Sequence, residues 1–252
     1  MNVFLKNAFK VALIILAIGL CITIIAVSVG GDVININNPK NTDLTETYTN
    51  VKSLVMEIGA SNIEVRESNE FKIDANHISK KGFKSYVSDG TWYIKENSSP
   101  AFLNFFGDDT TIIIYLPKDF ISEKLKIDIG AANFNADKLA ANKADIKVGA
   151  ANLKVNELIT EDIDIECGVG NVEINGKIQN NARIKCGVGN VTLNLLGNEK
   201  NYNYDFNVGL GSIVLNNNNF SGITEKVIDN EAIDREFKVE VGVGKVGIKI
   251  EE

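Results

Sequence analysis

The sequence predicts an all-β protein, a single β-solenoid or β-helix-like domain of stacked 19-residue repeats preceded by one N-terminal transmembrane helix. Three observations support this fold class. A glycine motif returns every 19 residues, apolar residues alternate on both sides of each motif glycine, and an uncharged apolar run lies near the N-terminus. A fixed period of this length indicates repeated units that stack on one another.

The uncharged run covers residues 11–29. At about 1.5 Å rise per residue, a helix of this length reaches about the 30 Å of a bilayer core. Lys6 and Lys10 precede the run and Asp32 follows it, so residues 1–10 are expected in the cytoplasm and the remainder outside. The chain is therefore predicted to be a single-pass protein of the cell membrane with an extracytoplasmic C-terminal domain.

A cleaved signal peptide is the alternative for this segment, because residues 26–28 (AVS) resemble a weak cleavage site. The apolar region of such a peptide usually has about 7–15 residues, so a retained anchor is favoured. Residues 30–50 are rich in Asn and Thr and contain Pro39. This composition predicts a polar linker between the membrane and an extracytoplasmic domain over residues 51–252.

The repeat motif has glycine at its third position and usually asparagine at its sixth. Four copies follow one another at 19-residue spacing, and looser copies lie before and after them. The regular copies are residues 128–133 (DIGAAN), 147–152 (KVGAAN), 166–171 (ECGVGN) and 185–190 (KCGVGN); the looser copies are residues 57–62 (EIGASN), 207–212 (NVGLGS) and 240–245 (EVGVGK).

Apolar residues precede each motif glycine by three and one positions and follow it by four and six. Around Gly130 these residues are Ile127, Ile129, Phe134 and Ala136. Such alternation is typical of β-strands, so each repeat is predicted to be a strand, a tight bend and a second strand. The glycine permits a positive φ or a close backbone approach at the bend. Stacked copies would share one continuous core.

Two columns of charged residues support in-register stacking, because opposite signs mostly alternate from repeat to repeat. Exposed pairs of this kind contribute about 0–1 kcal/mol each. The columns are therefore interpreted as devices that fix the register, and not as a catalytic cluster. They comprise Asp128, Lys147, Glu166 and Lys185, and Lys126, Asp145, Asp164 and Arg183.

The motif asparagines predict a third column, in which side-chain amides hydrogen-bond up the stack. A structural ladder is favoured over a ligand site. Cys167 and Cys186 occupy equivalent positions of adjacent repeats, where other copies carry Ile or Val. They are interpreted as small buried apolar residues, and the spacing of stacked strands would also allow a disulfide bridge between them. The column comprises Asn62, Asn133, Asn152, Asn171 and Asn190.

The period is lost in two segments. In the first, strands are expected at residues 83–87, 91–95 and 111–116, and an Asp-Gly pair at residues 89–90 predicts a hairpin turn between the first two. In the second, residues 216–235, a polar loop is expected to separate the last two motif copies.

An aromatic segment within the insertion over residues 98–109 is the partner-binding candidate. Its side chains would either cover one end of the solenoid core or, if exposed, contact a partner. The candidate residues are Phe102, Leu103, Phe105 and Phe106.

Catalytic and metal-binding groups are scarce. His77 is the one histidine of the chain, and its surroundings lack the spacing of a metal site or catalytic triad. Asp108 with Asp109, and Asp162 with Asp164, lack a recognised calcium-loop pattern. The glycine motif lacks the features of a dinucleotide or P-loop site. No catalytic residue, metal or cofactor is therefore predicted.

The balance of charge bears on partners. With Lys6 and Lys10 set aside, 24 basic and 33 acidic residues remain in the outward part. This excess of negative charge disfavours nucleic acid and anionic lipid headgroups as partners.

The N-terminal apolar run, the strand that ends in residues 112–117 (IIIYLP) and the repeated GAAN and GVGN units together resemble the bacterial putative-adhesin domain family of unknown function. The resemblance covers about residues 50–250. It implies a β-solenoid-like, extracytoplasmic, non-catalytic domain that is often anchored to the membrane. It assigns no binding or catalytic residues, and the insertion over residues 98–109 departs from it.

Three functions follow, in order of preference. The first is a membrane-anchored envelope protein, without enzymatic activity, whose solenoid binds an envelope polymer, a surface glycan or another protein. The second is an accessory or sensory component of an envelope-stress response. The third is a carbohydrate-active β-helix enzyme, which the scarcity of catalytic groups disfavours.

Overall fold

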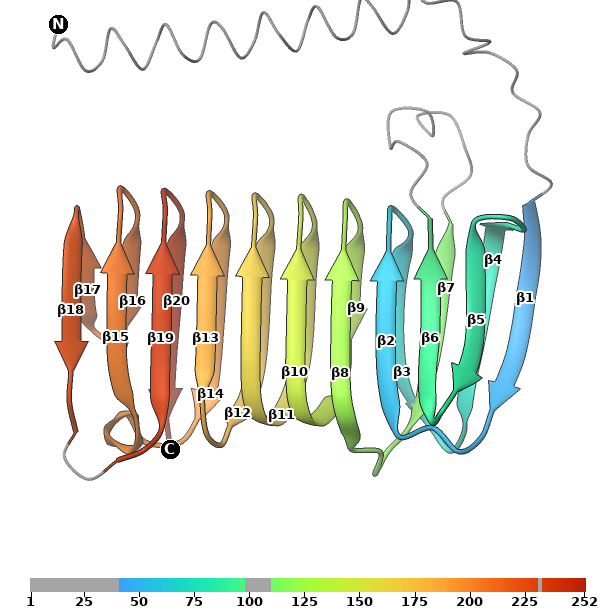
Figure 1. Ribbon diagram of the computed structural model, residues 1–252, viewed down its shortest axis with the longest axis horizontal. Helices are drawn as coiled ribbons and strands as arrows, with labels where there is room; N and C mark the ends of the chain where they lie inside the picture. Colours follow the sequence, from blue (N-terminus) through green and yellow to red (C-terminus); the bar gives the residue numbers. More distant parts are fainter. Residues whose placement is uncertain (1–40, 98–109, 231–232) are drawn as a thin grey trace, which may run out of the picture. The chain divides into compact units, whose positions relative to one another are not determined.

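The computed structural model describes residues 41–97, 110–230 and 233–252, which form two facing layers of β-strands (Figure 1). In each repeat, a strand of the first layer runs into the motif bend and a strand of the second layer runs away from it. We call the edge formed by the motif bends the corner edge, and the opposite edge the return edge. Together the two layers make the all-β, solenoid-like fold that the sequence predicts.

The strands of the first layer lie side by side in an order that differs from their order in the chain. Along the stack they are β18 (Thr224–Ile228), β15 (Asn203–Val208), β19 (Glu236–Val241), β13 (Ala182–Cys186), the second half of β11 (Asn152–Cys167), β10 (Leu139–Val148), β8 (Ser122–Ile129), β2 (Ser53–Ile58), β6 (Thr91–Glu96) and β5 (Phe83–Ser88).

The second layer follows the same order. Its strands are β17 (Asn218–Ser221), β16 (Ser212–Leu215), β20 (Lys245–Glu251), β14 (Asn190–Leu196), β12 (Asn171–Ile178), the first half of β11, β9 (Asn133–Ala136), β3 (Asn62–Ser68), β7 (Thr111–Pro117), β4 (Phe71–Ser79) and β1 (Asn41–Tyr48). A short 3-10 turn, η2 (Glu199–Asn201), precedes β15.

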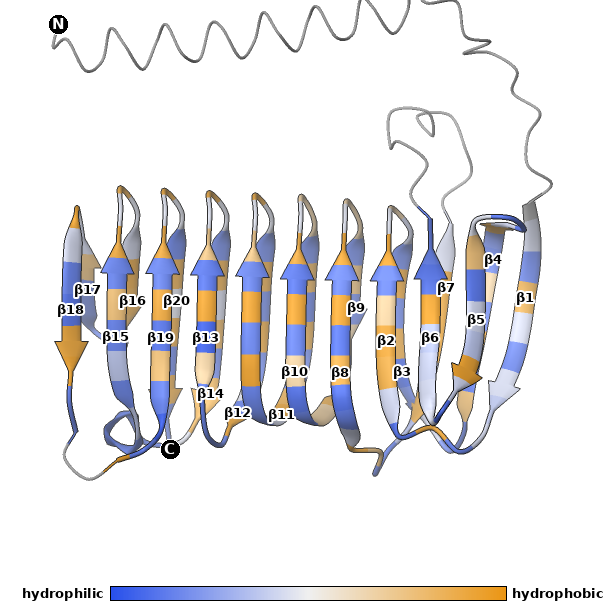
Figure 2. Ribbon diagram, in the orientation of Figure 1, coloured by the Kyte–Doolittle hydropathy of each residue, from blue (hydrophilic) through white to orange (hydrophobic). Residues whose placement is uncertain are grey.

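The 19-residue register is confirmed in the central repeats, where strands pair in parallel. Residue 145 of β10 pairs with residue 164 of β11, which in turn pairs with residue 183 of β13. Every second side chain points between the layers, and Figure 2 shows the resulting alternation along each strand. Ile127, Ile146, Ile165 and Ile184 are all completely buried. A ladder of like aliphatic residues therefore forms the core.

The bends require glycine for close approach of neighbouring backbones, and not for a positive φ. Among the motif glycines described, none lies in the left-handed region. A Cβ built on Gly170 would lie 2.0 Å from the carbonyl oxygen of Ala151 in the preceding repeat. No side chain fits that space.

The stack is closed at both ends by antiparallel strands and aromatic side chains. At one end β4 pairs antiparallel with β7 and β1, and β5 pairs antiparallel with β6. Trp92 is fully buried there, with its indole N–H 2.9 Å from the Ser85 hydroxyl. The expected Asp-Gly hairpin joins β5 to β6, with φ of 50° at Asp89 and 74° at Gly90. At the other end Phe206 packs 5.3 Å from Phe220, measured between ring centroids.

Two predictions about the chain outside the regular repeats are wrong. Residues 41–48, expected in the polar linker, form β1, because Thr45, Thr47 and neighbouring residues pair with β4. Residues 216–235, expected to form a polar loop, contain β17 and β18, which extend the two layers by one strand each. In both segments polar strands shield a sheet edge that would otherwise be open.

The motif bend between β2 and β3 lies beside Glu96, the last residue of β6. Among the described residues, no backbone carbonyl accepts the N–H groups of Gly59, Ala60 and Ser61. The Glu96 carboxylate accepts these three N–H groups instead, at 3.1, 3.0 and 3.2 Å. In a regular bend the first two of these N–H groups donate to carbonyl oxygens of the neighbouring repeat, as those of Gly130 and Ala131 do. The Glu96 carboxylate replaces those two acceptors and also accepts the third N–H group.

The predicted transmembrane helix over residues 11–29 lies outside the described residues. Within the described ranges, no helix is both long and apolar enough to cross a bilayer.

Candidate functional site

A polar groove runs across the second layer beside the corner edge. It has a volume of about 760 Å³ and crosses six adjacent strands, from β7 to β14. Its walls consist mainly of amide, hydroxyl and a few charged side chains, with aliphatic residues between them. The polar lining residues are Asn62, Glu64, Thr111, Asn133, Asn135, Asn152, Lys154, Asn171, Glu173, Asn190 and Thr192.

The motif asparagines form the predicted ladder along one side of this groove. Each Nδ2 donates to the Oδ1 of the preceding asparagine, and the four distances are 3.2, 3.2, 2.9 and 3.0 Å from Asn62 to Asn190. An asparagine amide has two N–H donors and an oxygen with two lone pairs. Because the ladder uses one donor and one lone pair of each inner amide, further hydrogen-bonding capacity remains for a ligand.

A second row lies five residues after each motif glycine. Asn135 and Thr192 are exposed there, and Lys154 forms a 3.2 Å ion pair with Glu173 between them. The groove therefore presents many neutral donors and acceptors and little net charge. Such a surface suits an extended, hydroxyl-rich ligand better than a strongly charged one.

The charge columns lie on the first layer and have the predicted register. Lys147 lies 3.2 Å from Glu166, and Glu57 pairs with both Lys95 at 2.9 Å and Lys126 at 3.1 Å. Hydrogen bonds from the two lysines lower the pKa of Glu57, chiefly that from Lys95. These pairs hold adjacent strands in register. Asp128, Lys147, Glu166 and Lys185 also line a shallow, open groove of about 510 Å³ on the first layer, beside the motif bends.

Asp164 is the exception in these columns. Its Oδ1 is buried, and no hydrogen-bond partner for this atom exists among the described residues. Its neighbours across the strands are Asp145 and Arg183. Burial raises the pKa of Asp164; Arg183 opposes this shift and Asp145 adds to it.

Asp164→Asn is expected to raise the melting temperature at neutral pH. Because the pKa of this carboxyl group is higher in the folded state, its protonated form favours folding, and this contribution is complete below the unfolded-state pKa. The contribution is lost as the pH rises through the folded-state pKa. The gain from the substitution should therefore shrink as pH falls toward 4. Thermal unfolding over this pH range tests the expectation. The control is Glu173→Gln, which removes an exposed carboxylate paired with Lys154 on the second layer and should give no gain.

Cys167 and Cys186 are buried free thiols in adjacent repeats. Each thiol donates to a carbonyl oxygen of its own bend, Cys167 to Gly170 at 3.2 Å and Cys186 to Gly189 at 3.0 Å. The adjacent Cys167 thiol and burial raise the pKa of Cys186, so it remains a neutral thiol. Both act as small core residues, as predicted.

The remaining predicted positions are not among the described residues that line the groove. The aromatic candidates Phe102, Leu103, Phe105 and Phe106 lie outside the described residues, as do Asp108 and Asp109. His77 adopts a φ of 57° in β4, where its backbone N–H donates to Asp43 at 3.0 Å. Asp162 accepts from the side chain of Asn181 at 3.0 Å. Within the described ranges, no three His, Cys, Asp or Glu residues gather as a metal site would require.

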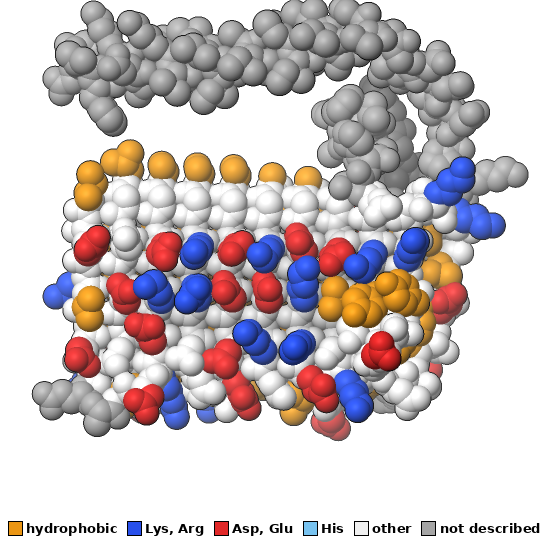
Figure 3. Space-filling view, viewed as in Figure 1, with side chains coloured by type: hydrophobic (Ala, Val, Ile, Leu, Met, Phe, Trp, Pro, Cys, Tyr) orange, Lys and Arg blue, Asp and Glu red, His pale blue; other side chains and the backbone are white. Residues whose placement is uncertain are grey.

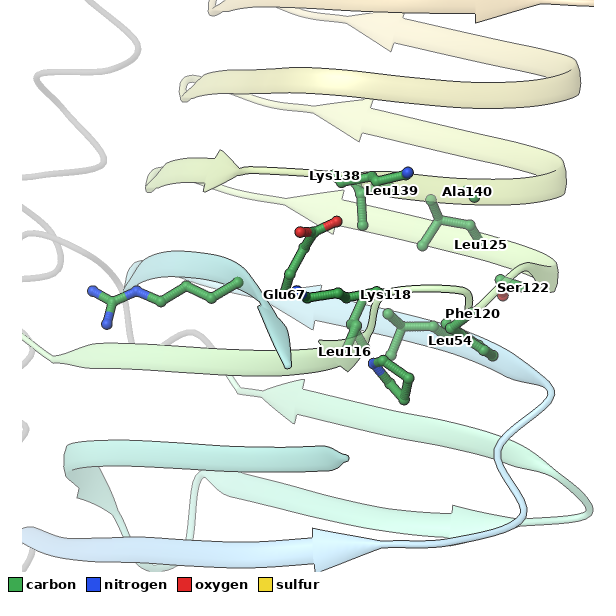
Figure 4. Close-up of a pocket in the computed structure, with 12 residues that line it drawn as sticks. Leu54, Glu67, Leu116, Lys118, Phe120, Ser122, Leu125, Lys138, Leu139 and Ala140 are labelled. Atoms are coloured by element: carbon green, nitrogen blue, oxygen red, sulfur yellow. The ribbon is translucent and has the colours of Figure 1, made fainter. Parts of the chain in front are cut away.

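A small, partly open pocket lies near the return edge, between Leu54, Leu116, Leu125 and Leu139, with Glu67, Lys118 and Lys138 also lining it (Figure 4). Its volume is about 10 Å³. That is room for about one water molecule, so it is a packing defect and not a ligand site.

The groove was not predicted from the sequence, although its asparagine ladder was. The signal that could have located it is the second polar column, five positions after each motif glycine. The middle residues of the bends were predicted only as small corner residues, yet several are exposed valine or leucine side chains, namely Val169, Val188, Leu210 and Val243.

Comparison with known proteins gives a family and several similar structures. A family model described as Toastrack DUF4097 matches residues 51–199. No curated protein matches the chain. Similar crystal structures include a putative cell adhesion protein from Clostridium sporogenes (19% identity, 84% of this chain and 100% of that chain, TM-score 0.46) and a putative adhesin from Parabacteroides distasonis (15%, 84% and 98%, TM-score 0.41).

A third similar structure is a putative lipid binding protein, also from Parabacteroides distasonis (14% identity, 85% of this chain and 98% of that chain, TM-score 0.40). All three TM-scores lie below 0.5, so any functional conclusion depends on the residues of this chain.

Proposed function

The chain belongs to the Toastrack DUF4097 family, as its resemblance to the putative-adhesin family indicated, and on that premise we propose that it is a membrane-anchored, non-catalytic binding protein of the cell envelope. Residues 11–29 would hold it in the membrane, with the two-layer domain outside the cell. The ligand would be an extended, neutral polysaccharide of the envelope, bound along the polar groove.

The continuous amide ladder along the groove is the observation that carries this proposal. Strands in a sheet lie about 4.8 Å apart, so the six strands that line the groove span about 24 Å. This length suits a chain-like ligand better than a single small molecule. The ladder also fixes the side-chain amides before binding, which lowers the entropic cost of forming hydrogen bonds to the ligand.

The proposal also holds that the groove has no catalytic activity, because its polar side chains are already held in hydrogen bonds and ion pairs with one another. The asparagines bond to one another, and Lys154 pairs with Glu173. Glycoside hydrolysis would need two carboxyl groups on either side of the bound sugar chain. The carboxylates that line the groove, Glu64 and Glu173, lie on β3 and β12, with β9 and β11 between these strands.

Replacing both Asn135 and Thr192 by alanine is expected to weaken polysaccharide binding by about tenfold. Both side chains are exposed in the groove, so their loss removes hydrogen bonds to the ligand without opening the core. Two hydrogen bonds of about 0.5–1.5 kcal/mol each account for a change of this size. Calorimetric titration of the full chain in lipid nanodiscs with neutral envelope polysaccharide fragments would measure the effect.

The matched control is Asn207→Ala with Thr224→Ala, a pair of the same residue types on the first layer. It should bind like the unchanged protein. Equal affinities for all three proteins would rule out the groove as the binding site.

A further inference from the structure

A ridge of exposed aliphatic side chains follows the corner edge. Its members are the middle residues of successive motif bends, with Ile223 of the turn between β17 and β18 at one end. Figure 3 shows a row of hydrophobic side chains along this edge. Backbone hydrogen bonds place them in order, since Val169 donates to Gly149, Val188 to Gly168 and Val243 to Gly187. In spatial order the aliphatic ridge comprises Ala131, Ala150, Val169, Val188, Val243, Leu210 and Ile223.

The five larger members of the aliphatic ridge are 58–88% exposed. Single exposed aliphatic residues are common on proteins, but this row is continuous across neighbouring strands over about 30 Å. A continuous apolar row on an otherwise polar surface is typical of a contact with another apolar surface.

The described chain begins at this same edge. Asn41 pairs with Ser79, and β4 runs antiparallel to β7, whose first residue Thr111 pairs with Asn62 at a motif bend. Asn41 therefore lies at the corner edge. Residues 30–40 separate it from the predicted membrane span, and eleven residues reach at most about 40 Å when extended. If residues 11–29 span a bilayer, the edge that carries the aliphatic ridge is therefore the edge from which the domain is tethered, within about 40 Å of the membrane.

The charges beside the aliphatic ridge nearly balance. The adjacent column of the first layer carries Lys147 and Lys185 among the carboxylates Asp128, Glu166, Glu240 and Glu225. On the other side Lys245 follows the asparagine ladder. An apolar row with balanced flanks suits a neutral lipid surface, whereas binding to anionic lipid would require a cluster of basic residues.

We propose that the corner edge rests on the outer surface of the lipid bilayer, with the aliphatic ridge in contact with lipid. This inference rests on the proposed membrane anchor. The polar groove, which lies directly beside the same edge, would then open close to the membrane surface.

The test is contact quenching in the full chain, reconstituted into phosphatidylcholine vesicles that contain brominated lipid. Val188→Trp places a fluorophore on the aliphatic ridge, and Ile121→Trp places one at the return edge, where the native side chain is 61% exposed. The native Trp92 is fully buried and gives a constant background. Brominated lipid should quench Val188→Trp several-fold more than Ile121→Trp.

Equal and weak quenching of both variants would overturn the inference. The inference would also be overturned if the fluorescence of Val188→Trp fell as the ratio of protein to lipid rose, and fell equally in vesicles without brominated lipid. That result would indicate contact between two copies of the chain. Replacing part of the phosphatidylcholine by phosphatidylglycerol should not strengthen the quenching; a clear increase would contradict the proposed neutral surface.

Extraction of the same vesicles with alkaline carbonate separates this inference from the proposed anchor. If the chain stays with the vesicles but Val188→Trp is not quenched, the ridge contact is wrong and the anchor stands. If the chain is extracted although Val188→Trp was quenched, the ridge contact stands and the anchor is wrong.

Discussion

Gly189→Ala is expected to destabilise the domain by about 3 kcal/mol or more, which is a large fraction of the stability of a typical domain. A Cβ at this position would lie 2.0 Å from the carbonyl oxygen of Gly170 and 2.9 Å from the Cys167 sulfur. The carbonyl oxygen belongs to a backbone held on both sides by neighbouring repeats. It cannot move without breaking the hydrogen bond that Asn190 donates to Gly170 at 3.0 Å.

Gly247→Ala is the matched control, because a Cβ at Gly247 in β20 meets no atom within 4 Å. This substitution should leave stability unchanged or raise it by about 0.4–1 kcal/mol. Urea unfolding of both variants, followed by circular dichroism, gives the comparison. Similar stabilities for the two variants would show that close backbone approach does not determine the choice of glycine in the bends.

Deletion of residues 236–252 is expected to abolish cooperative folding. The last two strands of the chain, β19 and β20, do not lie at the end of the stack. They lie between β13 and β14 on one side and β15 and β16 on the other, and pair in parallel with all four. Their loss would leave a gap one repeat wide inside the sheet. They also bury six apolar side chains, namely Phe237, Val239, Val241, Val246, Ile248 and Ile250.

At about 1.5–3 kcal/mol for each buried side chain, this loss is comparable with the whole stability of a domain. Limited proteolysis should therefore cleave the truncated chain between residues 182 and 230, where the unchanged protein resists. A synthetic peptide of residues 233–252, added in trans, should restore protection. Full protection of the truncated chain without the peptide would contradict the observed strand order.

Much of the regular stack could be predicted from the sequence, because its determinants are local and repeated. The 19-residue period set the register, and alternating apolar residues around Gly130 and its equivalents identified the strands. The Asp89-Gly90 turn located the hairpin of β5 and β6 for a similar reason, since two residues with positive φ determine its geometry.

The order of repeats at the two ends could not be predicted in this way. Equivalent motif copies present nearly identical pairing edges, so the residues of β19 do not indicate that its neighbours are β13 and β15. The 33-residue spacing between the last two copies signalled an interruption but not its role. In the structure, the residues between these two copies form β17 and β18 at the end of the stack. The chain then returns, and β19 lies between β13 and β15.

The groove was missed for a related reason. A polar residue on the outer face of a strand is common, and only the three-dimensional stack shows that Asn135, Lys154, Glu173 and Thr192 line one concavity with the asparagine ladder. The exposure of the valines in the bends was not predicted, because the need for small residues at a tight corner already accounts for most residues found there.

Hydrogen–deuterium exchange on the full chain in lipid nanodiscs, with and without neutral envelope polysaccharide, tests the central claim most directly. If the groove binds the polysaccharide, exchange should slow in β9, β12 and β14 at the motif asparagines, while the charged columns of the first layer remain unchanged. Slower exchange on the first layer alone, or no change in the presence of polysaccharide that is demonstrably bound, would contradict it.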